Sequence, residues 1–545
     1  MKLLARFRLS NANMTLVLAT FFSLILNVPV YSDLHKILSS LDNFSIGFAI
    51  SVPIFFILAL NILFNVLSWP YLIKPFFILI LIVSSLLSYA EFNYGIIFDK
   101  SMIRNLFETN SSEASSYFSA YSFIWFLLLG ILPAYLLAVW PIKRESIIIF
   151  CLKKIIYVAA SVVGILVIAF FFYQDYASVV RNNRFIADRI VPTAFIHNSY
   201  RYLRKEYFSA PIPYQFLGED AHQSTAALQL AQQKPTVLIF MVGETARAQN
   251  FSFNGYARNT TPYSQGQSTY NFKNVASCGT ATAISVPCMF SHMNRTKFDR
   301  DLADHQDNAI DIMKRAGIDL LWKENDGGDK HVAQGIQKVE LTVDKSNPLC
   351  NGRTCYDMAL LTDLDQEINA MKGNRAIFLH LIGSHGPTYF QRYPKSMAHF
   401  QPDCQRADIE NCSVQEIVNT YDNTLRYTDY VFNQVIEKLK SLQDHYNVGV
   451  IYISDHGESL GEDGLFLHGA PYRFAPKYQT HVPLMMWFSD GLIQAKQLNR
   501  SCLKSVADEG GQSQDNIFDS LLGIMDVQTS VYRPAQDIFS RCRKN

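Results

Sequence analysis

Acidic and histidine side chains follow three apolar runs in the C-terminal part of the sequence. Glu244 ends the run TVLIFMVGE, and His385 follows RAIFLHLIGS. Asp455 and His456 follow VGVIYIS. Carboxylate oxygens and imidazole nitrogens that converge from separate strands suit a divalent metal, and this mixture of donors favours zinc or manganese over calcium. One histidine at a strand end is more often structural, so the predicted metal site depends on the three positions together.

A short glycine-containing segment, Ser277–Ala283 (SCGTATA), precedes a predicted helix. Gly279 permits a tight turn, and the first amides of the following helix can bind a phosphate group. A threonine held beside a metal in this segment would have a lowered hydroxyl pKa and could act as a nucleophile. Threonine is also a common helix N-cap. The residues by themselves leave both interpretations open.

These chemical groups need a scaffold, and the surrounding sequence predicts one. Five apolar runs rich in β-branched and aromatic residues have the length of buried strands: 236–244, 317–325, 375–386, 448–459 and 481–490. They alternate with helical stretches such as the one around Ser413–Leu439. This alternation predicts an α/β sheet with helices on both faces. In such sheets ligands bind at the carboxyl ends of the strands, where the acidic and histidine residues lie.

Cysteines provide information about the compartment. Six of them form three close pairs: Cys278 with Cys288, Cys350 with Cys355, and Cys404 with Cys412. Local pairs of this kind indicate disulfides, which persist in oxidising compartments such as the periplasm, although free thiols would show the same spacing. Cys502 and Cys542 could form a fourth bond across a long separation. Cys151 lies beside the apolar part of the chain and is expected to stay reduced.

The N-terminal part of the chain is far more apolar than the rest. About 20 apolar residues are needed to cross a membrane as a helix, and five segments reach or approach that length: 13–31, 46–69, 71–91, 118–141 and 155–174. The first could instead be a cleavable signal peptide. However, NVPV at 27–30 offers no small-x-small cleavage pattern, and four further segments follow.

Basic residues predict how these segments are oriented. They lie before the first segment, at the third, and between the fourth and fifth: Lys2, Arg6, Arg8, Lys74, Lys143, Arg144, Lys153 and Lys154. The positive-inside rule places all three sites in the cytoplasm. The part of the chain after the fifth segment then lies outside, where the paired cysteines can be oxidised.

A polar loop separates the third and fourth apolar segments and is long enough for a short helix. Asn105, Thr109 and Glu113 are spaced four residues apart and would share one face of that helix. This face could be the solvated side of an interfacial amphipathic helix. It could equally bind a lipid head group beside the bilayer.

Four motifs resemble those of the phosphoethanolamine–lipid A transferases. They are VGETAR at 242–247, SCGTATAISVPC at 277–288, GSHGP at 383–387 and SDHGESLGEDGLFLHG at 454–469. That family includes the mobile colistin-resistance enzymes and belongs to the alkaline-phosphatase-like superfamily. The resemblance covers nearly the whole chain. It implies an N-terminal α-helical membrane domain with five transmembrane helices and a C-terminal periplasmic α/β domain of the alkaline-phosphatase/sulfatase type.

The resemblance also implies roles for individual residues. Zinc would be held by four residues: Glu244, Thr282, Asp455 and His456. Thr282 is the second threonine of the family's CGTxT pattern and would accept the phosphoethanolamine group. His385 and His468 would contact the transferred phosphate or a second zinc. Lys330 and the set Asn105, Thr109 and Glu113 would contact substrate.

The activity implied is transfer of phosphoethanolamine from phosphatidylethanolamine to a lipid A phosphate through a phosphothreonine-type intermediate. Polymyxin resistance is the expected phenotype. The implied enzyme is a multi-pass protein of the bacterial inner membrane that contacts membrane lipids and acts as a monomer. We expect a transmembrane domain at 1–173, a bridging helix and linker at 174–234, and a zinc-dependent catalytic domain at 235–545. The net charge of +1, without a basic run, gives no indication of nucleic-acid binding.

Alternatives and departures from the pattern remain. The acceptor could be a core sugar or another envelope glycan, the donor group could be phosphoglycerol, and a silent scaffold or metal sensor is a further possibility. A sulfatase is disfavoured because the Cys/Ser-x-Pro-x-Arg signature is missing. His331 stands where a small residue is expected, and Gln514 replaces a frequent histidine. We expect neither residue to contact the zinc ligands.

Overall fold

The computed structural model describes residues 8–39, 45–109, 114 and 117–543. The chain forms two compact units. The first unit comprises Met1–Ile103 and Ser119–Phe208, and the second unit comprises Arg104–Phe118 and Ser209–Asn545. The second unit contains all the residues predicted to do chemistry.

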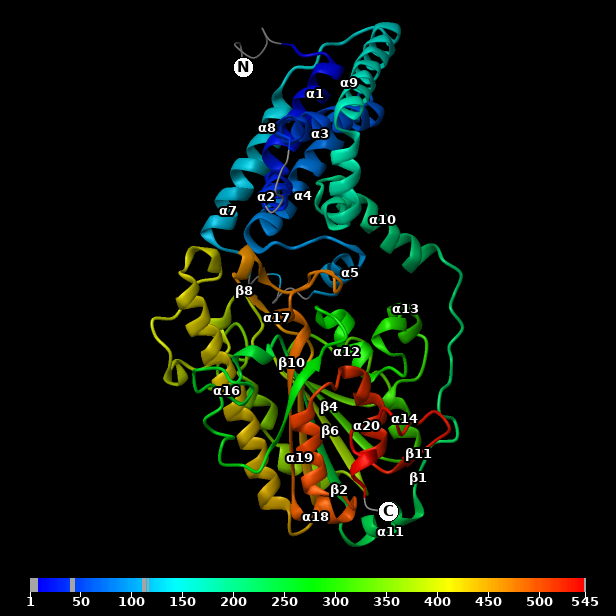
Figure 1. Ribbon diagram of the computed structural model, residues 1–545, viewed down its shortest axis with the longest axis vertical. Coiled ribbons are helices and arrows are strands. Elements are labelled where there is room, and N and C mark those ends of the chain that lie inside the picture. The colour runs from blue at the N-terminus through cyan, green and yellow to red at the C-terminus, as the bar shows by residue number, and fades with distance from the viewer. Residues whose placement is uncertain (1–7, 40–44, 110–113, 115–116, 544–545) are drawn as a thin grey trace. The chain divides into compact units, whose positions relative to one another are not determined.

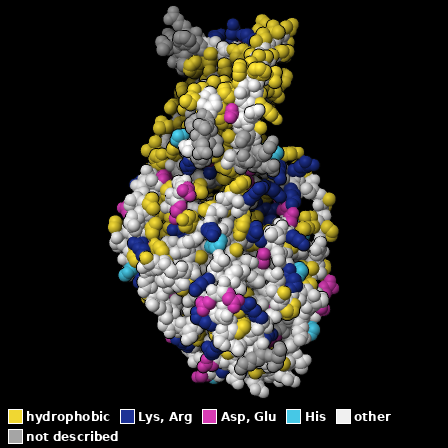
Figure 2. Space-filling model, viewed as in Figure 1, with side chains coloured by type: hydrophobic (Ala, Val, Ile, Leu, Met, Phe, Trp, Pro, Cys, Tyr) yellow, Lys and Arg dark blue, Asp and Glu magenta, His cyan; other side chains and the backbone are white. Residues whose placement is uncertain are grey.

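The first unit is helical (Figure 1). Its α-helices are α1 (Asn11–Phe21), α2 (Val28–Ser39), α3 (Ile46–Leu67), α4 (Ile73–Tyr94), α7 (Ala120–Phe126), α8 (Leu132–Val139), α9 (Ile147–Asn182) and α10 (Thr193–Phe208). Helix α5 (Lys100–Glu108) belongs to the second unit from Arg104 onward. Hydrophobic side chains cover most of the visible surface of these N-terminal helices (Figure 2). Such a surface suits lipid better than water.

Among the described residues, four helical spans are long and apolar enough to cross a membrane. They are Ile46–Leu67, Ile73–Tyr94, Ala120–Val139 and Ile147–Ala177. A fifth crossing exists if the bent pair Asn11–Leu26 and Val28–Ser39 counts as one span. The five predicted segments therefore correspond to four spans and one bent pair.

The predicted first segment, 13–31, is not one straight helix. The structure bends by 54° between Leu26 and Val28. Asn27 leaves the helical conformation, and its side-chain amide donates to the carbonyls of Phe22 and Val191 at 2.9 and 2.8 Å. Pro29 in the next turn lacks an amide hydrogen. Both features interrupt the backbone ladder, which explains the bend.

The predicted fifth segment, 155–174, is longer in the structure. Helix α9 begins at Ile147, where Ser146 caps it by accepting the Ile149 amide. Lys153 and Lys154, expected in a connection, therefore lie within the helix, and that expectation is wrong. Lys154 Nζ donates to the Ser68 carbonyl at 2.6 Å.

The second unit is built on a seven-stranded sheet (Figure 1). Its strands, in spatial order, are β3 (Tyr270–Ala276), β10 (His481–Phe488), β7 (Asn447–Ser454), β2 (Thr236–Gly243), β6 (Arg375–His380), β4 (Asp319–Glu324) and β5 (Gln337–Glu340). Strands β7, β2, β6, β4 and β5 pair in parallel, whereas β10 pairs antiparallel with β7 and β3. The carboxyl ends of the parallel strands therefore share one edge of the sheet.

Each of the five apolar runs forms a strand, namely β2, β4, β6, β7 and β10. Strand β2 is buried along its whole length, which accounts for its continuous apolar run. Strands β3 and β5 were not predicted. In β3, exposed Lys273 and Asn274 interrupt the apolar pattern, and β5 is a largely exposed edge strand.

Helices cover both faces of this sheet, as predicted (Figure 1). On one face Phe290 of α12 packs against Phe240 and Phe378, with ring centroids 5.6 and 5.7 Å apart. On the other, Phe432 of α16 contacts Tyr452 of β7 at 6.2 Å. The helices of this unit are α11 (Thr225–Gln233), α12 (Thr282–Phe290), α13 (Arg300–Ala303), α14 (Ala309–Arg315), α15 (Leu364–Ala370), α16 (Val414–Leu442), α17 (Lys477–Thr480), α18 (Asp490–Ala495), α19 (Arg500–Glu509) and α20 (Ile517–Ile524).

Two small ribbons complete the second unit. Strand β1 (His222–Gln223) pairs with β11 (Val527–Gln528), and β8 (Ser459–Leu460) pairs with β9 (Phe466–Leu467). Strand β1 and helix α11 both fall within the segment expected to be an extended linker, so the end of that segment is folded.

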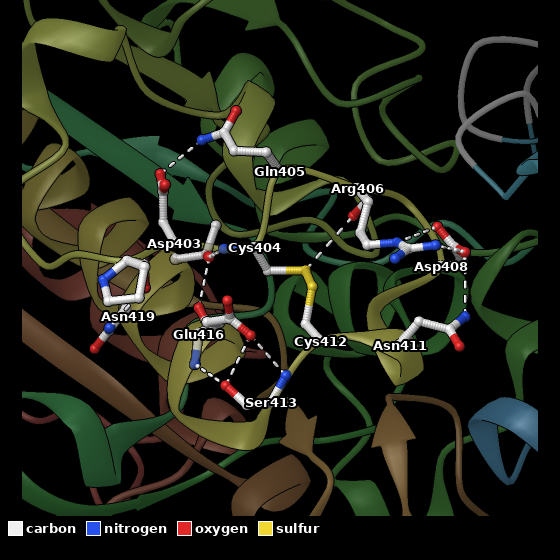
Figure 3. The surroundings of a disulfide bond; sticks show 12 residues. Asp403, Cys404, Gln405, Arg406, Asp408, Asn411, Cys412, Ser413, Glu416 and Asn419 are labelled. Carbon is white, nitrogen blue, oxygen red and sulfur yellow. Dashed lines mark hydrogen bonds and ion pairs between the residues drawn. A yellow bond between two sulfur atoms is a disulfide. The ribbon is translucent and has the colours of Figure 1, made fainter.

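Disulfides join the three close cysteine pairs, and a fourth joins Cys502 to Cys542 across 40 residues. Cys404–Cys412 closes a loop just before α16 (Figure 3). There Ser413 and Glu416 form a capping box that starts the helix. Cys502–Cys542 links α19 to the C-terminal turn, a pairing that sequence spacing left undecided.

Candidate active site

Four predicted ligands come together at the carboxyl edge of the sheet. Thr282 Oγ1 donates to Glu244 Oε2 at 3.2 Å and lies 3.4 Å from His456 Nε2. His456 Nε2 lies 3.6 Å from Glu244 Oε1 and 3.2 Å from Asp455 Oδ2. All four residues are buried. We call this group the catalytic cluster.

Sheet topology explains why these residues meet. Glu244 follows β2 and Asp455 follows β7, and the two parallel strands pair with Gly243 opposite Ser454. Residues that follow paired positions emerge side by side at the same edge. Thr282 comes from a distant part of the chain, at the first residue of α12.

Thr282 does not cap its own helix. The N-cap of α12 is Ala281, whose side chain makes no capping hydrogen bond. The N-cap interpretation of the threonine is therefore wrong, and its hydroxyl points at a carboxylate instead. At the start of a nine-residue helix, this hydroxyl lies next to amides that can receive a phosphate oxygen.

The backbone around Glu244 adopts an uncommon conformation. Thr245 has a φ of 51°, and its amide donates to Asp455 Oδ1 at 3.1 Å. Gly383 has a φ of 46°, and a Cβ there would lie 2.6 Å from the Glu244 carbonyl oxygen. A side chain cannot fit at position 383. This close approach holds the Glu244 main chain in place.

Electrostatics prepare the cluster for a cation. Burial lowers the pKa of His456 to about 4 against the opposing effect of Asp455, so its imidazole is neutral at pH 7. His456 Nδ1 donates to the Gly457 carbonyl at 2.9 Å, which leaves the Nε2 lone pair facing the cluster. Burial opposes ionisation of Asp455, but hydrogen bonds from the backbone amides of His456 and Thr245 favour its charged form and lower its pKa.

The donor set fits a divalent metal. Ligand atoms of Glu244, Asp455 and His456 all lie within 4.8 Å of one another. Two buried carboxylates this close repel each other unless a proton or a cation lies between them. Two carboxylates, a neutral imidazole nitrogen and a hydroxyl are a donor set that zinc accepts.

His385 and His468 lie beside the catalytic cluster. The His468 ring centroid is 4.3 Å from that of His456 and 5.9 Å from that of His385. Glu458, which sequence reasoning missed, lies 3.2 Å from His468 Nδ1 through Oε2 and accepts the Tyr389 hydroxyl at 3.0 Å through Oε1. Its position two residues after His456, in the run SDHGES, could have identified Glu458 as a candidate site residue. Glu458 orients His468 toward the cluster.

The position of Gln514 contradicts the expectation that this residue does not contact the predicted zinc ligands. Its Nε2 donates to the main-chain carbonyl of Asp455 at 2.6 Å and to that of Ser454 at 2.8 Å. Its Oε1 accepts the Cys278 amide at 2.6 Å. The buried side chain thus joins the segment before Thr282 to the end of β7. His331 is exposed and lies 3.4 Å from Asp304 instead.

The remaining predicted substrate residues are more scattered. Asn105 lies in α5 and Thr109 directly follows that helix, and the Thr109 hydroxyl donates to the Asn105 carbonyl at 2.8 Å. Glu113 lies outside the described residues. Lys330 has a φ of 47°, and its carbonyl accepts from Arg300 at 3.1 Å.

Arg300 is a further residue that sequence reasoning missed. Its Nε donates at 2.9 Å to the carbonyl of Ala283, the residue after Thr282. Its Nη2 lies 3.8 Å from Glu108 Oε1. Arg300 therefore links the segment that contains Thr282 to Lys330 and to Glu108, the residue before Thr109. No sequence motif singled it out.

Two family descriptions match the chain. Residues 236–527 match the sulfatase family, and residues 56–207 match the description "phosphoethanolamine transferase EptA/EptB". The second match begins within the apolar part of the chain and extends beyond residue 173.

Individual proteins match over nearly the whole length. Phosphoethanolamine transferase EptA of Escherichia coli K12 is 38% identical over 97% of this chain and 96% of its own. Phosphatidylethanolamine transferase Mcr-2 of Escherichia coli is 34% identical over 94% of each chain. The solved structure of the integral membrane lipooligosaccharide phosphoethanolamine transferase A from Neisseria meningitidis superposes with a TM-score of 0.93 at 37% identity. That match covers 99% of this chain and 100% of the other.

Proposed function

This chain belongs to the phosphoethanolamine transferase family, and from that premise we propose that Thr282 carries the phosphoethanolamine group from phosphatidylethanolamine to a lipid A phosphate. The chain is an integral membrane protein of the inner membrane with its second unit in the periplasm. Donor and acceptor lipids are both accessible from that side of the membrane. Anchoring keeps the enzyme close to both.

The observation that carries the proposal is the position of the Thr282 hydroxyl. Its Oγ1 donates to Glu244 Oε2 at 3.2 Å and lies 3.4 Å from His456 Nε2. Glu244 can take the hydroxyl proton, which leaves the oxygen able to attack phosphorus. A zinc ion held by Glu244, Thr282, Asp455 and His456 would lower the pKa of that hydroxyl and offset the phosphate charge.

The reaction has two steps. Thr282 Oγ1 forms a bond to the phosphorus of phosphatidylethanolamine, the bond from phosphorus to the glycerol oxygen breaks, and diacylglycerol leaves with a proton. An oxygen of the lipid A phosphate then attacks the same phosphorus, the bond to Thr282 breaks, and the proton of that lipid A phosphate passes through Glu244 to Thr282 Oγ1. The start of α12, His385 and His468 would stabilise charge on the phosphoryl oxygens.

Substrate contacts and stoichiometry follow the same proposal. Lys330, Asn105, Thr109 and Glu113 would contact the donor head group, and residues 235–545 would form the catalytic domain. One zinc would act with Thr282, and a second could bind at His385 and His468 during turnover. The enzyme would act as a monomer. Adding an ammonium group to a lipid A phosphate weakens the binding of cationic peptides, so we expect polymyxin resistance.

Mass spectrometry of lipid A tests this proposal. A host without its own transferase would express the wild type, Thr282→Ala or Thr280→Ala. Thr280 is a matched control because its hydroxyl donates to the Ala470 carbonyl at 2.6 Å and not to the catalytic cluster. We expect lipid A to carry the added phosphoethanolamine mass with the wild type and with Thr280→Ala, but not with Thr282→Ala.

Two results would contradict the proposal. Modified lipid A from Thr282→Ala would exclude Thr282 as the carrier. Unmodified lipid A from a well-expressed wild type, with the added mass on core sugars or another glycan, would transfer the acceptor assignment to that molecule.

A further inference from the structure

We propose that Glu244, Asp326 and His380 form a second divalent-cation site, which shares Glu244 with the catalytic cluster. Ligand atoms of these three residues lie within 4.8 Å of one another. We call the group Glu244, Asp326, His380 and the neighbouring Glu324 the rear cluster. Its proposed cation is distinct from any that binds at Thr282 or His468, because neither residue belongs to it.

Strand order brings the rear cluster together. Strand β6 lies between β2 and β4, and His380 pairs with Val242 on one side and with Glu324 on the other. Glu244 comes two residues after Val242, and Asp326 comes two residues after Glu324. The three ligands therefore emerge from three adjacent parallel strands at the same edge.

His380 is oriented as a metal ligand would be. The residue is fully buried, and its Nδ1 donates to Glu324 Oε2 at 2.9 Å. Its Nε2 makes no hydrogen bond with any residue that the structure describes, and it lies 3.8 Å from Asp326 Oδ2. Metal-binding histidines commonly donate their other ring nitrogen to a carboxylate in this way. The unpartnered Nε2 therefore points into the site.

Glu324 acts as a positioning residue and not as a ligand. Its Oε2 also accepts the Trp322 indole at 2.8 Å. Its Oε1 accepts the amides of Asp326 and Gly327 at 2.6 and 3.0 Å. Both oxygens are thus committed to hydrogen bonds that hold His380 and the Asp326 main chain.

The donor set indicates the class of cation. Two carboxylate groups and one imidazole nitrogen suit manganese or zinc, whereas calcium prefers a shell of oxygens. The rear cluster contains no hydroxyl that could attack phosphorus. A cation there would hold Glu244 in position and offset part of its charge.

Metal content of the full-length protein in detergent tests this site. The protein would be stripped with a chelator, equilibrated with buffered Mn²⁺ or Zn²⁺, and analysed by mass spectrometry of the metal. We expect Asp326→Asn and His380→Ala each to bind one equivalent less than the wild type. Glu367→Gln is the matched control. Glu367 forms an ion pair at 2.7 Å with Lys323, which lies on β4 next to Glu324, but Glu367 does not belong to the rear cluster.

The competing arrangement is a buried ion pair in which a protonated His380 balances Glu324 and Asp326 without a metal. Equal metal content in the wild type and in a folded Asp326→Asn would establish that arrangement and overturn the proposal. If either variant fails to fold, Glu324→Gln provides a second measurement. It should weaken binding of that equivalent by about 10- to 100-fold while saturating metal restores the full content.

Anomalous diffraction places the ion directly. Crystals of the full chain equilibrated with Mn²⁺, with data collected on both sides of the manganese edge, should show a peak between Glu244, Asp326 and His380. Density without an anomalous signal at that position would contradict the site. Neither measurement depends on lipid transfer, so failure here leaves the proposed function intact.

Discussion

The catalytic cluster and the rear cluster share Glu244, draw on the two strands that flank β2, and are built alike. Each combines buried carboxylates with one buried histidine at the ends of parallel strands. In each, the histidine donates through Nδ1 and directs Nε2 inward. They differ in two respects: the partner of Nδ1 and the presence of a hydroxyl.

Burial and the groups around each ring give the two imidazoles different charges. His456 donates to a backbone carbonyl, and burial lowers its pKa to about 4. Burial also disfavours the charged form of His380, but the adjacent Glu324 carboxylate outweighs burial and raises the pKa to about 9. The same residue type at equivalent strand ends is therefore neutral in one cluster and cationic in the other when no metal is bound. A carbonyl contributes a dipole, whereas a carboxylate contributes a full charge.

The hydroxyl decides the chemistry. Thr282 contributes an oxygen that can be phosphorylated, and the rear cluster has no equivalent among its members. We therefore expect substitutions in the catalytic cluster to abolish transfer. Substitutions of Asp326, His380 or Glu324 in the rear cluster should change metal content and stability more than they change transfer activity.

The largest effect is expected from Thr282→Ala. Loss of the nucleophile should reduce transfer by about 10³-fold or more, whereas Thr282→Ser keeps a hydroxyl and should keep measurable activity. Release of diacylglycerol from labelled phosphatidylethanolamine by the purified enzyme measures both. Equal activity of the serine and alanine variants would break the assignment of chemistry to this cluster.

Glu244→Gln should affect both clusters, since Glu244 is their shared member. We expect activity to fall by about 10²-fold or more, because a metal ligand and proton acceptor is lost. Metal content should fall by two equivalents, compared with one for Asp455→Asn. A loss of one equivalent in both variants would show that the clusters do not share Glu244 as a ligand.

Gln514→Ala should perturb the catalytic cluster alone. It leaves the Cys278 amide and the Ser454 and Asp455 carbonyls without their buried partner, at a cost of about 1–3 kcal/mol. Thermal unfolding should show a lower Tm, and transfer should fall by about tenfold, which corresponds to about 1.4 kcal/mol. Metal bound at the rear cluster should not change. Gln514→His, which keeps a donor, should retain more activity than Gln514→Ala.

Asp357 supplies the smallest predicted effect, and it depends on pH. Its carboxylate accepts the amides of Ile382 and Gly383, which follow β6, at 2.8 and 3.0 Å. Burial raises its pKa to about 6 despite those hydrogen bonds.

Because the folded pKa exceeds the ordinary value, the contribution of Asp357 to stability is fully present below about pH 4 and is lost as pH rises through about 6. As pH falls from 7 to 5, the Tm of the wild type should therefore rise relative to the Tm of Asp357→Asn, by the equivalent of about 1 kcal/mol. A difference that shrinks over this range would contradict the assigned pKa.

Much of the scaffold was predictable from local sequence. Strands β2, β4, β6, β7 and β10 are apolar runs because their residues are buried on both faces, whereas exposed residues in β3 and β5 removed that signal. The bend at Asn27 was predictable only in part, since Pro29 is visible in the sequence but the hydrogen bond from Asn27 to Val191 is not. Likewise, the short separation of three cysteine pairs predicted their disulfides. The Cys502–Cys542 disulfide depends on the tertiary fold, which brings the C-terminal turn next to α19.

By itself the sequence determined which side chains are chemically able to act, namely those in the motifs around Glu244, Thr282 and Asp455. It also determined the apolar spans. It could not determine which of these side chains meet. Strand β6, which carries His380, lies between β2 and β4 in the sheet, and so His380 meets Glu244 and Asp326. Gln514 reaches Asp455 from a turn that is distant in the chain. The charge of each histidine was likewise decided by tertiary structure, since it depends on burial and on the charged and polar groups that surround the ring.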